Sequence, residues 1–259
     1  MDRAGRTCSE GVKGSQSICR AIELIRTIAR YNDQGARLSD ISRRVGLNTS
    51  TVHRILSVLT EEGLITHDKT TKLYHLGLEL YLLGNQAHQF SARNQFRSSL
   101  ERIEERTENT AFLLIPSGND VLCIDRVEGR HPVRTVTVDV GARRPLGIGA
   151  GSLSLIAFRP EEEFRAMVRT NASRYGRYQG LTAEDILRLG AEARERGYVV
   201  SKGLFHYQVI SVGVPIFDAG QGPVAAITVS ATSDRMNEET RDNIAQLVWE
   251  TVRSEGAVS

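Results

Sequence analysis

Apolar residues in the first third of the chain recur at helical spacing in three successive segments. Over residues 17–31 an apolar side chain returns every three or four positions, which predicts an amphipathic helix that ends before Gly35. The apolar positions of this helix are Ile18, Ala21, Ile22, Ile25, Ile28 and Ala29. A shorter helix follows Leu38, and a third helix ends at Gly63.

Capping residues set the expected bounds of the second and third helices. Ser39 is the predicted N-cap of the second helix, and Gly46 ends that helix. After the turn of Gly46 and Leu47, either Asn48 or Thr49 can cap the third helix. The apolar side of the third helix consists of Val52, Ile55, Leu56 and Leu59. Two helices joined by so short a turn are typical of a helix-turn-helix.

Two short strands follow the helices. Residues 64–68 and 72–76 flank the polar turn Lys69-Thr70-Thr71, which predicts a β-hairpin. Three helices followed by a hairpin is the order of a winged helix-turn-helix domain, here assigned to residues 15–77. Residues 1–14 are rich in Gly, Arg and Ser without apolar periodicity, and a flexible tail is expected there.

The remainder of the chain alternates helical and extended segments. Residues 78–107 have a helical pattern with a break near Gly84 or Ser91. Their apolar stripe, made of Leu80, Leu83, Ala87 and Phe90, is either a dimer contact or packs on its own domain. The strands expected beyond it are residues 110–115, 121–126, 133–138, 198–202, 209–217 and 224–231. The expected helices are residues 152–158, 161–170, 181–196 and 237–255, with Thr182 and Asp185 at capping-box spacing.

Charge is distributed unevenly between these two regions. The whole chain has a net charge of +2, but residues 1–76 carry 12 Lys and Arg against 8 Asp and Glu. Residues 77–259 carry 21 against 23. A basic N-terminal region is typical of a module that binds a polyanion, although two domains with different surfaces would show the same imbalance.

The third helix presents a polar side opposite its apolar side. At 100° per residue, Ser50, Arg54 and Ser57 lie on this side, flanked by Thr51 and His53. Arginine can donate two parallel hydrogen bonds to guanine, while hydroxyl groups and lysines suit phosphate contact. We therefore predict DNA binding; the alternative is that these residues only face water. The predicted DNA contacts are Ser39, Asn48, Thr49, Ser50, Thr51, His53, Arg54, Ser57, Lys69 and Lys72.

These segments resemble a known protein family. The sequence from Ser39 to Ile65, followed by Tyr74 to Gly77, is similar to the N-terminal domain of IclR-type bacterial transcriptional regulators. Its most specific part is Ser50 to Arg54. The segments that continue the resemblance are 125–129, 144–146, 197–198 and 214–218, so that it covers about residues 15–255.

The resemblance implies an α+β fold in three parts. These are the winged helix-turn-helix domain, a linking helix over residues 78–96, and a GAF-like effector-binding domain over residues 97–259 with a six-stranded, mainly antiparallel sheet. It also implies a transcriptional regulator that binds double-stranded operator DNA, responds to a small molecule and assembles as a homodimer or homotetramer. The expected target of regulation is a catabolic operon.

A glycine-rich segment before an apolar helix is the candidate effector site. Glycines at 147, 149 and 151 let the backbone approach a ligand, and free N–H groups at a helix start attract anions. A tight turn is the alternative, because the spacing matches neither a dinucleotide fingerprint nor a phosphate loop. The resemblance places ligand contacts nearby, although Ser201 to His206 stands where the family usually has acidic residues. The predicted effector-binding residues are Arg144, Gly149, Ala150, Gly151, Ser152, Ser201 and Ser211. We hypothesise a small organic acid, with an aromatic acid as one candidate, whose carboxylate lies near the N–H groups of Gly151 and Ser152.

Patterns of catalysis and metal binding are missing from the sequence. It contains no Gly-x-Ser-x-Gly, His-Glu-x-x-His, Cys-x-x-Cys or Walker sequence, so we expect no enzyme, metal or cofactor. Asp125 and Glu128 are neighbours of arginines, which favours surface ion pairing. A partner-binding scaffold without a ligand remains an alternative function.

Location in the cell follows from hydropathy and cysteine content. No apolar run approaches the ~18 residues that a bilayer span needs, and the N-terminus lacks the apolar core of a signal peptide. Cys8, Cys19 and Cys123 match neither a zinc spacing nor a disulfide framework. We therefore expect a cytoplasmic protein that does not contact a membrane.

Overall fold

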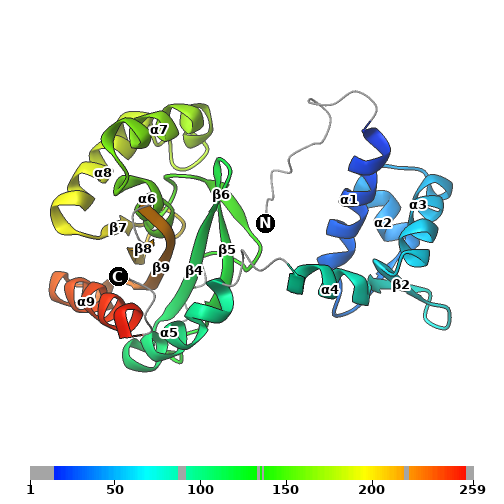
Figure 1. Cartoon of the computed structure of the whole chain (residues 1–259), viewed down its shortest axis with the longest axis horizontal. Helices are drawn as coiled ribbons and strands as arrows, with labels where there is room; N and C mark the ends of the chain where they lie inside the picture. The colour runs from blue at the N-terminus through cyan, green and yellow to red at the C-terminus, as the bar shows by residue number, and fades with distance from the viewer. Residues whose placement is uncertain (1–14, 87–91, 133–134, 136, 219–221, 255–259) are drawn as a thin grey trace. The chain divides into compact units, whose positions relative to one another are not determined.

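The computed structural model describes residues 15–86, 92–132, 135, 137–218 and 222–254. The chain divides into two compact units, residues 1–90 and 91–259 (Figure 1), and each has its own apolar core. Among the described residues, no helix has the length and apolar character required to span a bilayer.

The first unit consists of three helices, a short strand and a hairpin. Its elements are α1 (Gln16–Ala29), β1 (Ala36–Arg37), α2 (Leu38–Val45), α3 (Thr49–Glu61), β2 (Ile65–Asp68) and β3 (Leu73–Leu76). The strands form an antiparallel sheet in the order β1-β3-β2, so the predicted helices and hairpin are confirmed. The sequence did not predict β1, because a strand of two residues is too short to show a period.

The core of this unit differs from the expected one in α1. Leu24 and Ile28 are fully buried and pack with the apolar sides of α2 and α3, whereas Ile18 is 66% exposed and Ile22 is 39% exposed. At 3.6 residues per turn, Ile18 and Ile22 lie roughly 100–140° around the helix from that buried side. The six apolar positions of the sequence pattern therefore belong to more than one side of the helix.

The caps of α2 and α3 also differ from the prediction in one case. Arg37 occupies the N-cap position of α2 without a side-chain hydrogen bond, so the predicted capping role of Ser39, which lies in the first turn of α2, is wrong. Gly46 ends α2 in the left-handed conformation, as expected. Asn48 is the N-cap of α3, and its side chain accepts a hydrogen bond from the backbone of Thr51.

Two helices follow the hairpin in the region of the predicted linker. α4 (Leu78–Gln86) and α5 (Ala92–Thr107) cover the described part of the expected helical segment. Leu80 and Leu83 of the expected apolar stripe lie in α4, and Ala87 and Phe90 lie outside the described residues. The large apolar side chains of α4 that are most exposed are Leu78, Tyr81, Leu82 and Leu83.

The second unit is built on one antiparallel sheet of six strands. The strands are β4 (Thr110–Ser117), β5 (Asp120–Val127), β6 (Arg143–Pro145), β7 (Val199–Lys202), β8 (Val209–Asp218) and β9 (Gly222–Thr232). Their order is β6-β5-β4-β9-β8-β7, and every neighbouring pair is antiparallel. The expected strand at 133–138 is wrong for its described residues, which are irregular; the sixth strand is β6.

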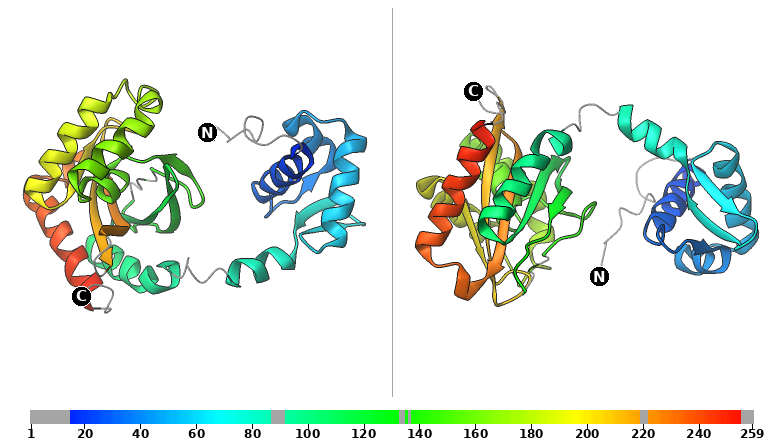
Figure 2. Two further views of the ribbon diagram at one scale, coloured as in Figure 1. Left: turned by 45° about the horizontal axis from the view of Figure 1, so that its top comes forward. Right: turned by 90° about the horizontal axis from the view of Figure 1, so that it is seen from below.

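Helices cover both faces of this sheet. α5 and α9 (Glu238–Ser254) lie on one face, while α6 (Ala150–Ala157), α7 (Glu161–Tyr175) and α8 (Ala183–Arg196) lie on the other (Figures 1 and 2). The predicted capping box starts α8: Thr182 Oγ1 accepts from the Asp185 backbone at 3.2 Å, and Asp185 Oδ2 accepts from the Thr182 backbone at 3.1 Å.

The cysteines depart from the expectation in one respect. Cys123 is a buried free thiol on β5. Cys19 is disulfide-bonded, which the cysteine spacing did not indicate.

Candidate functional site

The exposed side of α3 carries the residues predicted to contact DNA. Val52, Leu56 and Leu59 are buried in the core of the first unit. This packing leaves the opposite side exposed, including Thr49, Ser50, His53, Arg54 and Ser57, with Thr51 half-buried. Asn48 Oδ1 accepts from the Thr51 backbone at 2.8 Å and from Ser50 Oγ at 3.0 Å.

Two details of α3 were not visible in the sequence. Ser57 Oγ donates to the carbonyl of His53 at 2.9 Å, so its proton is engaged within the helix. Val58, which sequence reasoning missed, is 54% exposed next to Ser57. A methyl-bearing side chain on a recognition helix can contact a thymine methyl group.

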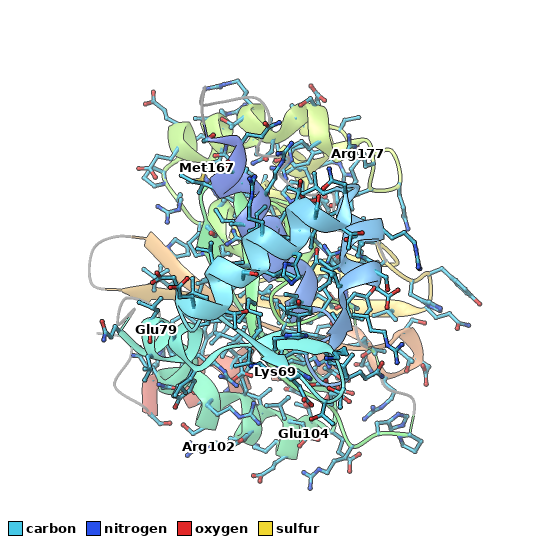
Figure 3. All side chains as sticks on the ribbon, turned by 90° about the vertical axis from the view of Figure 1, so that its right-hand side faces the viewer. Lys69, Glu79, Arg102, Glu104, Met167 and Arg177 are labelled. Carbon is cyan, nitrogen blue, oxygen red and sulfur yellow. The ribbon has the colours of Figure 1, made fainter. Side chains whose placement is uncertain are left out.

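The hairpin presents both of its lysines to solvent. Lys69 and Lys72 are exposed at the turn between β2 and β3, where Figure 3 shows Lys69. Asp68 orders this turn by accepting from Thr71 Oγ1 at 2.7 Å and from the backbones of Thr70 and Thr71 at 2.8 and 3.3 Å. These hydrogen bonds lower the pKa of Asp68. Ser39, the remaining predicted contact, is exposed in the first turn of α2.

A narrow cavity in the second unit lies at the predicted effector site. Its volume is about 30 Å³, and β4, β5, β8 and β9 meet the start of α6 around it. The lining residues are Phe112, Leu114, Val121, Cys123, Thr137, Val138, Ala142, Arg144, Ile148, Gly149, Ala150, Gly151, Ser152, Phe205, Ser211 and Thr228. Of the predicted effector contacts only Ser201 is absent from this lining; it pairs with Ser211 across β7 and β8.

The start of α6 forms part of the cavity wall. Gly149 precedes the helix with a φ of 90°, and the next three residues are buried cavity-lining residues. The first N–H groups of a helix have no carbonyl partner within it. Ser152 Oγ is already engaged, because it accepts from the Gly147 backbone at 3.0 Å and donates to the Pro145 carbonyl at 3.3 Å. The backbone of Ser152, rather than its hydroxyl, is therefore the group suited to an anion.

Arg144 supplies a positive charge at the same cavity. Its guanidinium lies over the Phe205 ring at 3.7 Å and donates to the carbonyl of Thr137. Burial lowers the pKa of Arg144 from its ordinary value, although an arginine remains charged at neutral pH. The predicted contact Arg144 therefore lies on the cavity wall.

Thr228 is a cavity residue that sequence reasoning missed. Its Oγ1 is buried and has no hydrogen-bond partner among the described residues. The neighbouring hydroxyls of Ser211 and Ser230 satisfy each other at 2.7 Å. Cys123 is not a reactive group here, because burial raises its pKa to about 12. Thr228 lies within a continuous apolar strand, so no sequence signal distinguished it.

Metal ligands do not cluster among the described residues of either unit. No group of three or more His, Cys, Asp and Glu side chains that could hold a metal ion occurs in the part of the chain that the structure describes.

Comparisons with known proteins identify both units. The model of the bacterial transcriptional regulator IclR C-terminal domain matches residues 85–255, and that of the IclR helix-turn-helix domain matches residues 17–69. The chain belongs to the IclR family. The transcriptional repressor AllR of Escherichia coli is 27% identical over 256 residues, covering 97% of this chain and 93% of AllR. The resemblance inferred from Ser50 to Arg54 is thereby confirmed.

Solved structures of the IclR family share the fold. The Thermotoga maritima IclR structure matches with a TM-score of 0.74 and 25% identity, covering 92% of this chain and 96% of that one. An IclR homologue from Microbacterium hydrocarbonoxydans, complexed with 4-hydroxybenzoate, matches with a TM-score of 0.76 and 23% identity over 92% and 98% of the two chains. As a member of the family, the chain is a transcriptional regulator with a helix-turn-helix DNA-binding domain and an IclR effector domain, not an enzyme.

The unpaired hydroxyl of Thr228 predicts an unusual effect on stability. Thr228→Val should leave the free energy of unfolding unchanged or raise it by up to about 1 kcal/mol, because a buried hydroxyl without a partner is unfavourable. Ser230→Ala is the matched control and should lower it by about 1 kcal/mol, since it leaves Ser211 unpaired. Urea unfolding followed by the fluorescence of Trp249, the single tryptophan, measures both. A larger loss in Thr228→Val than in Ser230→Ala would contradict this assignment.

Proposed function

We propose that this regulator controls a catabolic operon by binding operator DNA through α3 and the hairpin, and that a small organic acid in the second unit modulates this binding. The exposed hydroxyl and arginine side of α3 is the observation that carries the DNA-binding part. The buried N–H groups at the start of α6, beside Arg144, carry the effector part.

In the DNA-binding part, α3 enters the major groove with its N-terminal turns. Arg54 is long enough to donate two hydrogen bonds to a guanine edge, and Ser50 and Thr51 are suited to phosphate or base edges. Asn48 holds the first turn of α3 in place through its cap, so these short side chains start from an ordered backbone. Lys69 and Lys72 contact the phosphates beside the groove.

Arg54 and Lys72 separate base recognition from phosphate binding. Arg54→Ala should weaken operator binding by ~1–3 kcal/mol and relax specificity at one base position. Lys72→Ala should weaken binding to all DNA sequences alike and reduce the slope of log affinity against log salt by about 1. Fluorescence anisotropy on the genomic fragment selected by the wild-type chain, and on single-base variants of it, measures both. An Arg54→Ala chain with wild-type affinity and base preference would refute the role of Arg54.

In the effector part, a carboxylate binds the free N–H groups of Ala150, Gly151 and Ser152. Arg144 adds a charge-assisted hydrogen bond, and Thr228 can pair with a second polar group of the ligand. The family member complexed with 4-hydroxybenzoate supports an aromatic acid as one candidate. The cavity is narrow, about 30 Å³, so lining side chains such as Phe205, whose ring lies 3.7 Å from the Arg144 guanidinium, move aside when such an acid enters.

Acid binding is tested with 4-hydroxybenzoate by calorimetric titration. Arg144→Ala should weaken binding roughly 10-fold or more, because a hydrogen bond between charged groups contributes about 1.5–3 kcal/mol. Gly151→Val should abolish it, since a Cβ there would lie 2.1 Å from Thr228 Oγ1 and 2.4 Å from Leu114 Cδ1.

Two controls accompany this titration. Arg143→Ala should bind like the wild type, because Arg143 is exposed on the same strand and donates to Ser117 Oγ at 2.6 Å. The methyl ester of the acid, which lacks the charge, should bind poorly to every variant. Equal binding by wild type, Arg144→Ala and Gly151→Val would place the acid elsewhere.

Self-association is the third part of the proposal. One winged helix reads few base pairs, and two copies read half-sites spaced by a helical turn or its multiples. Leu78, Tyr81 and Leu82 occupy one side of α4 by their i, i+3, i+4 spacing and are 68%, 65% and 44% exposed. We infer that a second copy of the chain covers this side in a homodimer, which can pair again into a homotetramer.

Substitution on α4 tests this contact. Tyr81→Glu combined with Leu82→Glu should shift the chain toward monomer, because two charges would be buried without partners in the interface. Gln86→Glu adds a charge at an exposed position near the end of the same helix and should leave the assembly unchanged. Sedimentation velocity measures the oligomeric state. An unchanged assembly in the double variant would exclude this side of α4.

A further inference from the structure

A β-bulge in β5 reverses the direction of its side chains next to the cavity. Leu114 of β4 lies opposite Cys123, but Leu113 lies opposite Asp125, so Ile124 is an extra residue in β5. In a regular strand Cys123 and Asp125 would point to the same face. Here Cys123 lines the cavity on the α6 side, and Asp125 reaches α5 on the opposite face.

Asp125 binds two arginines in the first turns of α5. Its side chain is 4% exposed, Oδ1 accepts from Arg97 at 3.1 Å, and Oδ2 lies 3.5 Å from Arg93 Nε. Arg97 also donates to Glu101 at 2.7 Å, one turn further along the helix. The expected ion pairing of Asp125 is thus confirmed, but its carboxylate is buried and its partners are Arg93 and Arg97, because the bulge turns it under α5.

The same bulge contacts the wall of the cavity. Cys123 Sγ lies 3.5 Å from the carbonyl of Asp125, and both belong to the bulged segment. The guanidinium of Arg126 donates to the carbonyl of Val138, a cavity residue, at 3.4 Å and to Asp139 at 3.3 Å. Residues 123–126 thus touch the cavity on one side and the start of α5 on the other.

The far end of α5 is held by a separate contact. Glu104, 7% exposed and seen in Figure 3, accepts from the backbone of Arg130 at 2.9 Å and from its side chain at 3.2 Å. Neither residue lines the cavity. α5 is therefore tied to the segment 123–130 by two buried carboxylates, of which only Asp125 is adjacent to the cavity wall.

We propose that Asp125 is the positioning residue that couples the state of the cavity to the first turns of α5. A nearly buried carboxylate between two arginines needs its partners close by, since separating them leaves a charge unpaired. A ligand that displaces Cys123 or Val138 moves the bulge, and Arg93 and Arg97 follow. α5 is the first element after residues 1–90, so this displacement reaches the chain where the DNA-binding unit ends. The ligand's role rests on the proposed function, whereas the anchor, which is the pair of ion pairs from Asp125 to Arg93 and Arg97, does not.

The anchor is tested without ligand in the full chain. Asp125→Asn should speed amide hydrogen exchange at least tenfold in residues 93–98 and leave residues 100–107 near wild type. Glu104→Gln, the matched loss of the buried carboxylate at the other end of α5, should leave residues 93–98 unchanged. If Asp125→Asn does not fold, Arg97→Gln removes the other partner and should speed exchange in the same residues. Unchanged exchange there overturns the proposal.

Coupling is tested by adding 4-hydroxybenzoate at a concentration that saturates its thermal shift. Exchange of residues 93–98 should change at least threefold in wild type and in Glu104→Gln. In Asp125→Asn it should not change, although the thermal shift persists, a combination that a merely structural role would not produce. An Asp125→Asn chain that responds like wild type overturns the proposal.

A ligand-free arm keeps this test separate from the proposed function. If the acid gives no thermal shift with wild type, the proposed effector class fails. The substitution Gly151→Ala then perturbs the cavity in place of the acid. Its added Cβ would lie 2.4 Å from Leu114, which is opposite Cys123 at the bulge. Exchange of residues 93–98 should respond to Gly151→Ala in the wild-type background and not in Asp125→Asn. Equal responses in both backgrounds overturn the coupling.

Discussion

The close approach of α6 to the sheet is the constraint on which the effector unit depends. A Cβ on Gly213 of β8 would lie 2.3 Å from the backbone of Ala150, and one on Gly151 would meet Thr228 and Leu114. Because these two positions lack side chains, the first turn of α6 lies directly against β8 and β9. The first residues of that turn, whose N–H groups have no carbonyl partner within the helix, are thereby buried at the cavity wall, where such groups favour a negatively charged ligand.

The N-termini of α3 and α6 differ in whether a side chain caps them. In the first unit, Asn48 satisfies the start of α3, so that helix presents side chains rather than backbone to its partner. In the second unit, Gly149 leaves the start of α6 without a side-chain cap, so the backbone itself is available to a ligand. The bulge at Ile124 then lets one strand serve the cavity and α5 together, which an uninterrupted β5 could not do.

Most elements could be predicted because their signals are local. The helical spacing of Val52, Leu56 and Leu59, the Gly46 stop and the Thr182–Asp185 capping box each depend on residues within a few positions. The errors arise where local signals overlap. Ile18 and Ile22 match a helical period but lie off the buried side of α1. The segment 133–138, rich in valine and threonine, matched the pattern of a strand better than the three residues of β6 did.

The features of the candidate sites also divide into those that one segment determines and those that depend on tertiary contacts. The amino-acid sequence by itself determined the polar side of α3, the basic hairpin and the glycines before α6, because each is a property of one short segment. Only the tertiary structure decided that Arg144 stacks on Phe205, that Thr228 faces the cavity unpaired, and that Asp125 lies beneath α5. Those facts depend on strand order and on a one-residue change of register between strands. Such pairings join residues far apart in the chain, so no single segment carries a signal for them.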